Sequence, residues 1–144
     1  MLHLSHSVAE TEAIASRLAS TLTGGECIAL YGDLGAGKTQ FVRGLLIGLD
    51  GNARSVSSPT FVLLNVYDTG RLKLFHLDAY RVAGADDFEA IGFAELLEQN
   101  GIVVVEWADR VKSLLPAKRI LVHIRPAFGA AGRESREIEV ERET

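Results

Sequence analysis

The sequence predicts a single-domain α/β fold, with a mixed β-sheet that contains an antiparallel hairpin and is flanked by helices. An apolar run, a glycine-rich loop and a helical stretch follow one another over residues 27–46, which is a strand–loop–helix order. Strand-like runs at 61–67 and 72–77 are joined by too few residues for a parallel crossover, so they are expected to form a hairpin. The β-branched run at 102–105 is typical of a central strand buried on both faces.

A helix is expected before the first of these strands. Ser7-Val8-Ala9-Glu10 matches a capping box, in which the serine and the glutamate each bond a backbone N–H at the helix start. Ile14, Leu18 and Leu22 then recur on one helical face. Because glycine commonly follows the last turn of a helix, Gly24-Gly25 is expected to close this one.

After the hairpin, the sequence predicts two helices and three strands. In chain order they are a helix from Asp86 to a cap at Asn100-Gly101, the strand at 102–105, a short helix at 109–115, a strand at 120–124 and a strand at 137–141. The last strand alternates glutamates with apolar residues. Charged positions protect an exposed sheet edge from pairing with other chains, so this strand is expected at the edge.

Size, composition and charge narrow the class of protein. A chain of 144 residues can form one domain with a core, and no apolar stretch approaches the length of a membrane span. The N-terminus shows no signal-peptide pattern and the single cysteine, Cys27, excludes an internal disulfide, so a cytoplasmic protein is expected. A net charge of −4 without a basic run disfavours strong direct binding of nucleic acid, although a site shared with a partner stays open.

The glycine-rich loop is a P-loop, and it makes the expected fold that of a P-loop NTPase. Gly32–Thr39 fits G-x-x-x-x-G-K-S/T, in which backbone N–H groups and the positive end of the next helix bind phosphate oxygens. Lys38 is expected to reach the β- and γ-phosphates, and Thr39 to ligate Mg²⁺. The residues expected to bind nucleotide here are Asp33, Leu34, Gly35, Ala36, Gly37, Lys38, Thr39 and Gln40.

Polar segments stand at the start and the end of the predicted hairpin. Ser58-Pro59-Thr60-Phe61 is expected to be a segment that responds to the γ-phosphate, in which the Thr60 hydroxyl can bind metal or phosphate. The alternative is an ordinary turn at the start of a strand. After the second strand, Asp78 is expected to hold a metal-bound water or to orient the attacking one. Its neighbours are interpreted as structural: His76, Tyr80 and Arg81.

The strand at 102–105 ends in an acid, Glu106, which is the form of a Walker B strand with Glu in place of the commoner Asp. This acid is expected to reach Mg²⁺ directly or through water, with capping of the next helix as the alternative. Trp107 follows and is expected to form a wall of the nucleotide site. Asp109 and Arg110 are close enough in sequence to contact nucleotide or Mg²⁺, with surface ion pairing as the alternative.

The nucleotide is expected to be ATP, because the sequence has neither an N-K-x-D segment to read guanine nor the D-x-x-G of a GTPase switch. Three functions fit such a chain: a Mg²⁺-dependent ATPase acting as an accessory switch, a small-molecule kinase, and a nucleotide-gated binding module without hydrolysis. A kinase needs an acceptor pocket and a lid, for which little chain is left. The ATPase is therefore preferred.

Taken together, the motifs resemble the bacterial TsaE (YjeE) family over most of the chain. The resemblance rests on four segments in this order and at these spacings: Gly32–Thr39, Ser58–Phe61, His76–Arg81 and Val105–Trp107. Gly132-Arg133 also looks like the family's pattern. The P-loop alone is generic, whereas the four segments together are specific.

The resemblance implies a small mixed α/β P-loop ATPase that binds ATP and Mg²⁺ and hydrolyses ATP slowly alone. It also implies association with the TsaD–TsaB pair, which transfers a threonylcarbamoyl group to N6 of adenosine 37 in tRNA, so that contact with tRNA is indirect. Hydrolysis is expected to reset that complex rather than to perform the transfer.

The resemblance further assigns roles by position. Lys38 and Thr39 would bind phosphate and Mg²⁺, and Glu106 would ligate Mg²⁺. The other roles it implies are a switch-like segment for Thr60, support of hydrolysis for Asp78, the nucleotide site for Trp107, the vicinity of the adenine for Thr11, and a nucleotide contact for Arg133.

Overall fold

The structure is a computed structural model, and it describes residues 1–33, 37–52, 64–81, 85–127 and 135–143. Its strands are β1 (Leu2–Ser5), β2 (Cys27–Tyr31), β3 (Leu64–Tyr67), β4 (Leu74–Asp78), β5 (Ile102–Glu106), β6 (Arg119–Pro126) and β7 (Arg136–Glu143). Its helices are α1 (Val8–Ser20), α2 (Lys38–Gly48), α3 (Ala85–Ala90) and α4 (Phe93–Leu97), with 3₁₀ segments η3 (Ala79–Arg81) and η4 (Ala108–Leu114). Within the described ranges, none of the helices has the length and apolar character that crossing a membrane requires.

The strands form one sheet of seven strands in the order β1-β7-β6-β2-β5-β4-β3. The four inner strands run parallel to one another, whereas β3, β7 and β1 each pair antiparallel with the strand beside them. The predicted mixed sheet is therefore confirmed. The predicted hairpin is β3–β4, with Leu64 opposite Leu77; of its first strand, residues 61–63 lie outside the described ranges.

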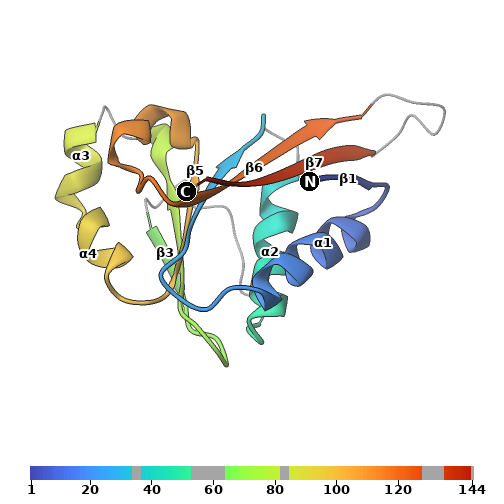
Figure 1. Ribbon diagram of the computed structural model, residues 1–144, viewed down its shortest axis with the longest axis horizontal. Coiled ribbons are helices and arrows are strands. Elements are labelled where there is room, and N and C mark those ends of the chain that lie inside the picture. Colours follow the sequence, from blue (N-terminus) through green and yellow to red (C-terminus); the bar gives the residue numbers. More distant parts are fainter. Residues whose placement is uncertain (34–36, 53–63, 82–84, 128–134, 144) are drawn as a thin grey trace.

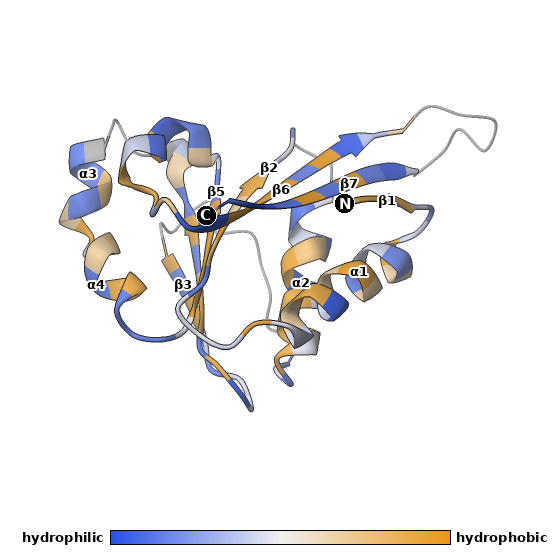
Figure 2. Cartoon of the chain, in the orientation of Figure 1, coloured by the Kyte–Doolittle hydropathy of each residue, from blue (hydrophilic) through white to orange (hydrophobic). Residues whose placement is uncertain are grey.

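Alternation of side chains along the inner strands builds two apolar layers. In β2, Ile28 and Leu30 pack with α1 and α2, whereas Cys27 and Ala29 pack on the opposite face with α3, α4 and η4. Figure 1 shows the two groups of helices on opposite sides of the sheet, and Figure 2 shows apolar residues concentrated in the strands between them. Burial of β5 along its whole length confirms the predicted central strand.

Helices α1 and α2 approach closely because glycine and alanine meet at their crossing. A Cβ atom at Gly44 would lie 2.4 Å from Glu12 O and 2.7 Å from Ala15 Cβ, and one at Gly48 would lie 2.6 Å from Ala19 Cβ. The two glycines, like the two alanines, are four residues apart and so share one helix face. This packing fixes α2, and with it the P-loop lysine at its first residue, against the sheet.

The N-terminal helix starts as predicted and ends earlier. Ser7 Oγ accepts the Glu10 N–H at 3.0 Å, and Glu10 Oε2 accepts the His6 N–H at 2.8 Å, which confirms the capping box with the glutamate reaching one residue further back. The helix ends at Ser20, so the prediction that Gly24-Gly25 closes it was wrong. These glycines have φ of 113° and 91° and instead shape the turn into β2.

The C-terminal strand is not at the edge of the sheet, which corrects the sequence prediction. β7 lies between β6 and β1, and β1 forms the edge without having been predicted. Glu137 and Glu139 on β7 each lie 3.7 Å from the Arg125 guanidinium on β6, so the alternating charges serve cross-strand pairing. Leu2 and Leu4 of β1 are more than half exposed, which is why their alternation carries no burial signal.

The single helix predicted from Asp86 is two short helices, α3 and α4. Gly92 lies between them with φ of 87°, a left-handed conformation that interrupts a helix. Phe88 and Phe93 still pack together across the break, with ring centroids 4.8 Å apart. The short helix predicted at 109–115 is present as the 3₁₀ segment η4.

Candidate nucleotide-binding site

The carboxyl ends of β2, β4 and β5 meet at one edge of the sheet, which is where open α/β sheets bind ligands. β2 leads into the P-loop, while β4 and β5 end at Asp78 and Glu106, which are paired in register. Both acids lie on the strand face that carries Leu74 and Val104, which is the face covered by α2. Since α2 begins at Lys38, the fold brings three predicted site residues together.

Glu106 has a partner at each carboxylate oxygen. Oε2 lies 2.5 Å from His76 Nε2, and Oε1 lies 3.5 Å from Lys38 Nζ. The exposed fraction of the side chain is 7% for Lys38 and Glu106 and 0% for His76. Burial raises the pKa of Glu106, but its interactions with His76 and Lys38 outweigh burial and hold this pKa below its ordinary value. The carboxylate is therefore ionised, and the His76 Nε2–H donates to it.

Lys38 is a buried cation with weak partners. Its Nζ makes an ion pair with Glu106 and lies 4.1 Å from the centre of the Trp107 ring, but makes no hydrogen bond to any described residue. A buried ammonium without acceptors is unfavourable, and phosphate oxygens are acceptors that would satisfy it. Gly37 precedes it with φ of 109°, a left-handed turn that glycine adopts without strain.

Asp78 shows the opposite pKa shift from its neighbour. Its Oδ1 accepts the backbone N–H of Tyr80 at 2.8 Å. Burial and the charge of Glu106 raise the pKa of Asp78, against the opposing effects of the Tyr80 N–H, Lys38 and His76. Two adjacent carboxyls thus differ in proton affinity, which suits the ionised Glu106 to a cation and Asp78 to holding or accepting a proton.

Trp107 follows β5 in a left-handed conformation, with φ of 56° and ψ of 41°. This conformation is uncommon for a bulky residue, and such strain is concentrated at functional sites. The indole lies 5.0 Å from the Tyr80 ring, and Arg110 Nη1 donates to Tyr80 O at 2.8 Å, which ties the segment after β5 to the segment after β4. Trp107 thereby packs against Lys38. Its place in a wall of the nucleotide site stays a prediction.

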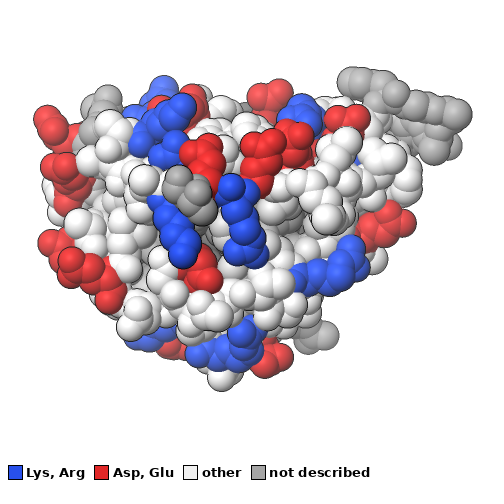
Figure 3. Space-filling view, viewed as in Figure 1, with Lys and Arg blue, Asp and Glu red and all other residues white. Residues whose placement is uncertain are grey.

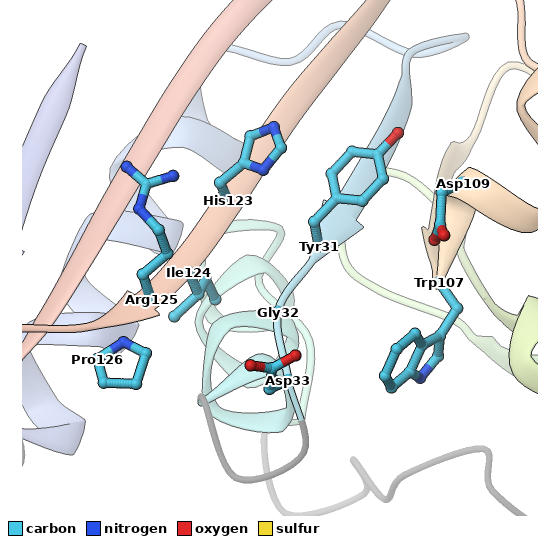
Figure 4. A pocket seen from close by; sticks show the side chains of 9 residues that line it. All are labelled: Tyr31, Gly32, Asp33, Trp107, Asp109, His123, Ile124, Arg125 and Pro126. Carbon is cyan, nitrogen blue, oxygen red and sulfur yellow. The ribbon is translucent and has the colours of Figure 1, made fainter.

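A cavity of about 270 Å³ adjoins the start of the P-loop. Figure 4 shows Tyr31 and His123 side by side in its lining, with Trp107 and Asp109 across from them. The two rings stack with centroids 4.7 Å apart and an interplanar angle of 13°. Asp33 and Asp109, both predicted nucleotide contacts, are exposed and line this cavity rather than the buried cluster around Lys38.

Acidic and basic side chains are interspersed over the face shown in Figure 3. Ion pairs between β6 and β7 include Arg119 with Glu143 at 3.2 Å. Lys and Arg side chains on this face therefore stand among acidic ones, and the predicted lack of strong direct nucleic-acid binding stays a prediction.

The other predicted residues have different positions. Thr39 and Gln40 lie in the first turn of α2, after Lys38. Thr11 is buried on α1, and its Oγ1 lies 2.7 Å from Ser5 Oγ, so its hydroxyl already has a partner. The predicted residues outside the described ranges are Leu34, Gly35, Ala36, Thr60 and Arg133.

His76 is the residue whose place in the site the sequence reasoning missed. It was interpreted as structural, yet it is in direct contact with Glu106. One signal was present: His76 and Asp78 are two residues apart in a strand, so they lie on the same face. What the sequence did not show is that Glu106 of the neighbouring strand lies within reach.

These donors fit a nucleotide that arrives with Mg²⁺. Among the residues that the structure describes, no group of three or more His, Cys, Asp or Glu side chains could hold a metal ion by itself. Proteins commonly hold Mg²⁺ through one or two carboxylates together with phosphate oxygens. Asp78 and Glu106 offer carboxylates and Thr39 a hydroxyl at the start of α2, and the unsatisfied Lys38 ammonium suits a phosphate.

The chain is similar to known proteins over most of its length. The model of the family "Threonylcarbamoyl adenosine biosynthesis protein TsaE" matches residues 5–137. The tRNA threonylcarbamoyladenosine biosynthesis protein TsaE of Bacillus subtilis is 41% identical over 129 residues, 90% of this chain and 77% of that one. Its counterpart in Treponema pallidum is 42% identical over 122 residues, 85% and 89% of the two chains.

A solved structure shows the same fold. The crystal structure of YdiB from Bacillus subtilis superposes with a TM-score of 0.78 at 31% sequence identity, covering 99% of this chain and 84% of that one. The chain therefore belongs to the TsaE family of tRNA threonylcarbamoyladenosine biosynthesis proteins.

Proposed function

We propose that this protein binds ATP with Mg²⁺ and hydrolyses it slowly, as a cytoplasmic accessory ATPase of tRNA N6-threonylcarbamoyladenosine synthesis. The observation that carries the proposal is the buried Lys38 at the start of α2, which lacks a hydrogen-bond acceptor and lies beside Glu106 and Asp78. Phosphate oxygens would satisfy that ammonium and leave the two acids to a cation and a water.

Each residue of the site has a role in this scheme. Lys38 would exchange its ion pair with Glu106 for phosphate oxygens, and Thr39 and Glu106 would hold the metal. When bound, Mg²⁺ supplies positive charge that offsets the charge developing on the phosphate oxygens. Asp78, whose raised pKa marks a readiness to take a proton, would orient the attacking water. Thr60 would belong to a segment that responds to the γ-phosphate.

The proposed partners are the TsaD and TsaB proteins, and contact with tRNA would be indirect. Membership of the TsaE family supports a place in this pathway. The net charge of −4 and the mixed surface also favour protein partners over direct binding of tRNA.

The first test is ATP binding to a Lys38→Ala variant, measured by calorimetry. Removing the ammonium should weaken binding at least about 100-fold, because charge-assisted bonds to phosphate are lost. Lys73→Ala is the matched control, since Lys73 is an exposed lysine with a 3.9 Å ion pair to Asp68. Unchanged affinity in Lys38→Ala would remove the phosphate role from this residue.

The second test is phosphate release with and without purified TsaD and TsaB. Stimulation by the pair is expected, because turnover by the protein alone is proposed to be slow. A phosphorylated small molecule in place of free phosphate would identify a kinase instead. Binding to the pair that depends on ATP but leaves ATP intact would identify a nucleotide-gated module.

A further inference from the structure

The two oxygens of the Glu106 carboxylate have partners that differ in conformational freedom. Oε2 is bonded to His76, an imidazole that is completely buried on β4, the strand next to β5. Oε1 faces Lys38, whose long side chain comes from α2 and whose contact with this oxygen is a 3.5 Å ion pair. His76 has two rotatable side-chain bonds and sits in a packed sheet, whereas lysine has four and a helix-terminal position. The first contact is therefore fixed by the fold, and the second is able to exchange.

Nucleotide binding would use this difference. If Lys38 turns to phosphate, Glu106 loses the partner at Oε1, and a buried carboxylate with no partner is strongly unfavourable. The His76 bond keeps one partner in place and fixes the orientation of the carboxylate. Oε1 is then the oxygen left free, on the side from which Lys38 has departed.

We propose that His76 is the positioning residue of Glu106: it holds Oε2 throughout the nucleotide cycle, so that Oε1 is presented to the cation when Lys38 moves to phosphate. This inference rests on the proposed function, because it concerns the same site. It adds a separate role for each partner of Glu106: His76 orients the carboxylate, and Lys38 leaves it for phosphate.

The arrangement of the strands supports a fixed partner. Leu74, Val104 and Ile102 lie on the same face of β4 and β5 and are fully buried, and the His76 side chain is itself 0% exposed, so close packing restricts movement of the ring. The Nε2–H tautomer is required, since an ionised carboxylate only accepts hydrogen bonds. The contact therefore depends on a donor at one point in space, which can be tested by replacing the ring with side chains that keep or lose that donor.

The test compares His76→Gln with His76→Met, which are unbranched and similar in volume but differ in the amide N–H. Calorimetry measures ATP affinity with Mg²⁺ and with EDTA, and the ratio of the two gives the contribution of the metal. In His76→Met this ratio should fall at least about tenfold, as is typical when a residue behind a metal ligand is lost. In His76→Gln it should return to within about threefold of wild type, because the amide again donates to Oε2. Affinity in EDTA should stay within about threefold of wild type in both, since the loss is confined to the metal.

A purely structural role for His76 makes a different prediction. Both variants would then melt at lower temperature by similar amounts and show the wild-type ratio. That result, or an equal loss of the ratio in the two variants, would overturn the proposal. If wild type itself fails to bind ATP, the proposed function fails instead, and the two failures are thus distinguishable.

A second measurement needs no variant and covers the case in which His76→Met does not fold. The Nε2–H of His76 should give a proton resonance protected from exchange with water in wild-type protein, because the ring is buried and bonded. The resonance should persist when a non-hydrolysable ATP analogue and Mg²⁺ are added, while the Lys38 ammonium signal changes. Loss of the His76 resonance on loading would show that the bond is not kept, and would overturn the proposal.

Discussion

The buried polar side chains of the described residues form two clusters, which differ in charge and in how completely their hydrogen-bonding groups are paired. The first, the site cluster, consists of Lys38, His76, Asp78 and Glu106; the second, the hydroxyl cluster, consists of Ser5, Thr11 and Ser135. Ser5 Oγ lies 2.7 Å from Thr11 Oγ1 and donates to Ser7 O, and Ser135 Oγ lies 3.0 Å from His6 Nδ1. The hydroxyl cluster is neutral and fully bonded, and it ties β1 and α1 to the start of β7.

The site cluster is charged and incompletely bonded. Within the described residues, Lys38 Nζ and His76 Nδ1 have no hydrogen-bond partner, and the pKa values of Asp78 and Glu106 move in opposite directions. Buried polar groups that serve the fold are normally satisfied within the protein, so unsatisfied ones call for an explanation. The hydroxyl cluster therefore holds structural elements together, whereas the site cluster retains unused hydrogen-bonding capacity that the proposed nucleotide would use.

The largest expected effect is on turnover, from Glu106→Gln. The amide keeps the shape of the side chain but loses the charge that would hold Mg²⁺, so phosphate release should fall at least about 100-fold. ATP affinity in EDTA should be no lower than in wild type, because Lys38 is released from its ion pair. Wild-type dependence of turnover on Mg²⁺ in this variant would remove Glu106 from the metal site.

The next prediction concerns the pH dependence of stability, which should differ between Asp78 and Glu106. The folded-state pKa of Asp78 is raised above its ordinary value of 3.8, so folding binds a proton and stability falls as pH rises through that window. Asp78→Asn keeps the acceptor for the Tyr80 N–H and removes this penalty. Its melting temperature in EDTA should therefore exceed that of wild type at pH 7, and the gain should vanish at pH 3. Turnover should nevertheless fall about 100-fold, as for loss of a group that accepts a proton.

The pKa shift of Glu106 has the opposite direction to that of Asp78, so Glu106→Gln serves as the internal comparison. Its folded-state pKa is lowered from 4.5, so its ionised form contributes stability above that value, which is lost as pH falls. Glu106→Gln should therefore melt below wild type at pH 7 in EDTA, with the two converging at low pH. If both variants shift the melting temperature in the same direction at pH 7, the contrast between the acids is wrong.

The smallest effect is expected in the hydroxyl cluster. Ser5→Ala leaves the buried Thr11 hydroxyl without its partner, which should cost about 1 kcal/mol of unfolding free energy and lower Tm by roughly 4 °C. Turnover and ATP affinity should stay at wild-type values. A loss of ATP affinity without a change in Tm would instead connect this cluster to the nucleotide, in keeping with the prediction that Thr11 lies near the adenine.

Much of the fold and part of the site could be predicted because their signals are local. The apolar run of β2, the β-branched run of β5 and the short turn of the hairpin each lie within a few residues, and all three are present as expected. Lys38 and Glu106 were likewise found from motifs next to those strands. Errors arose where a local pattern was ambiguous. The apolar periodicity predicted one helix where Gly92 separates two, and the alternating glutamates of β7 are compatible with an inner strand as well as with an edge strand.

The P-loop and the acid that ends the central strand could both be identified from the sequence, because each is a pattern within a single segment. Three contacts could be seen only in the folded chain: β1 covers β7, the Thr11 hydroxyl bonds to Ser5, and His76 bonds to Glu106 from 30 positions away. The same holds for the opposite pKa shifts of Asp78 and Glu106, two strand ends brought together by register. Burial and electrostatic interaction depend on distance in space, and residues far apart in the chain come close only when the sheet forms.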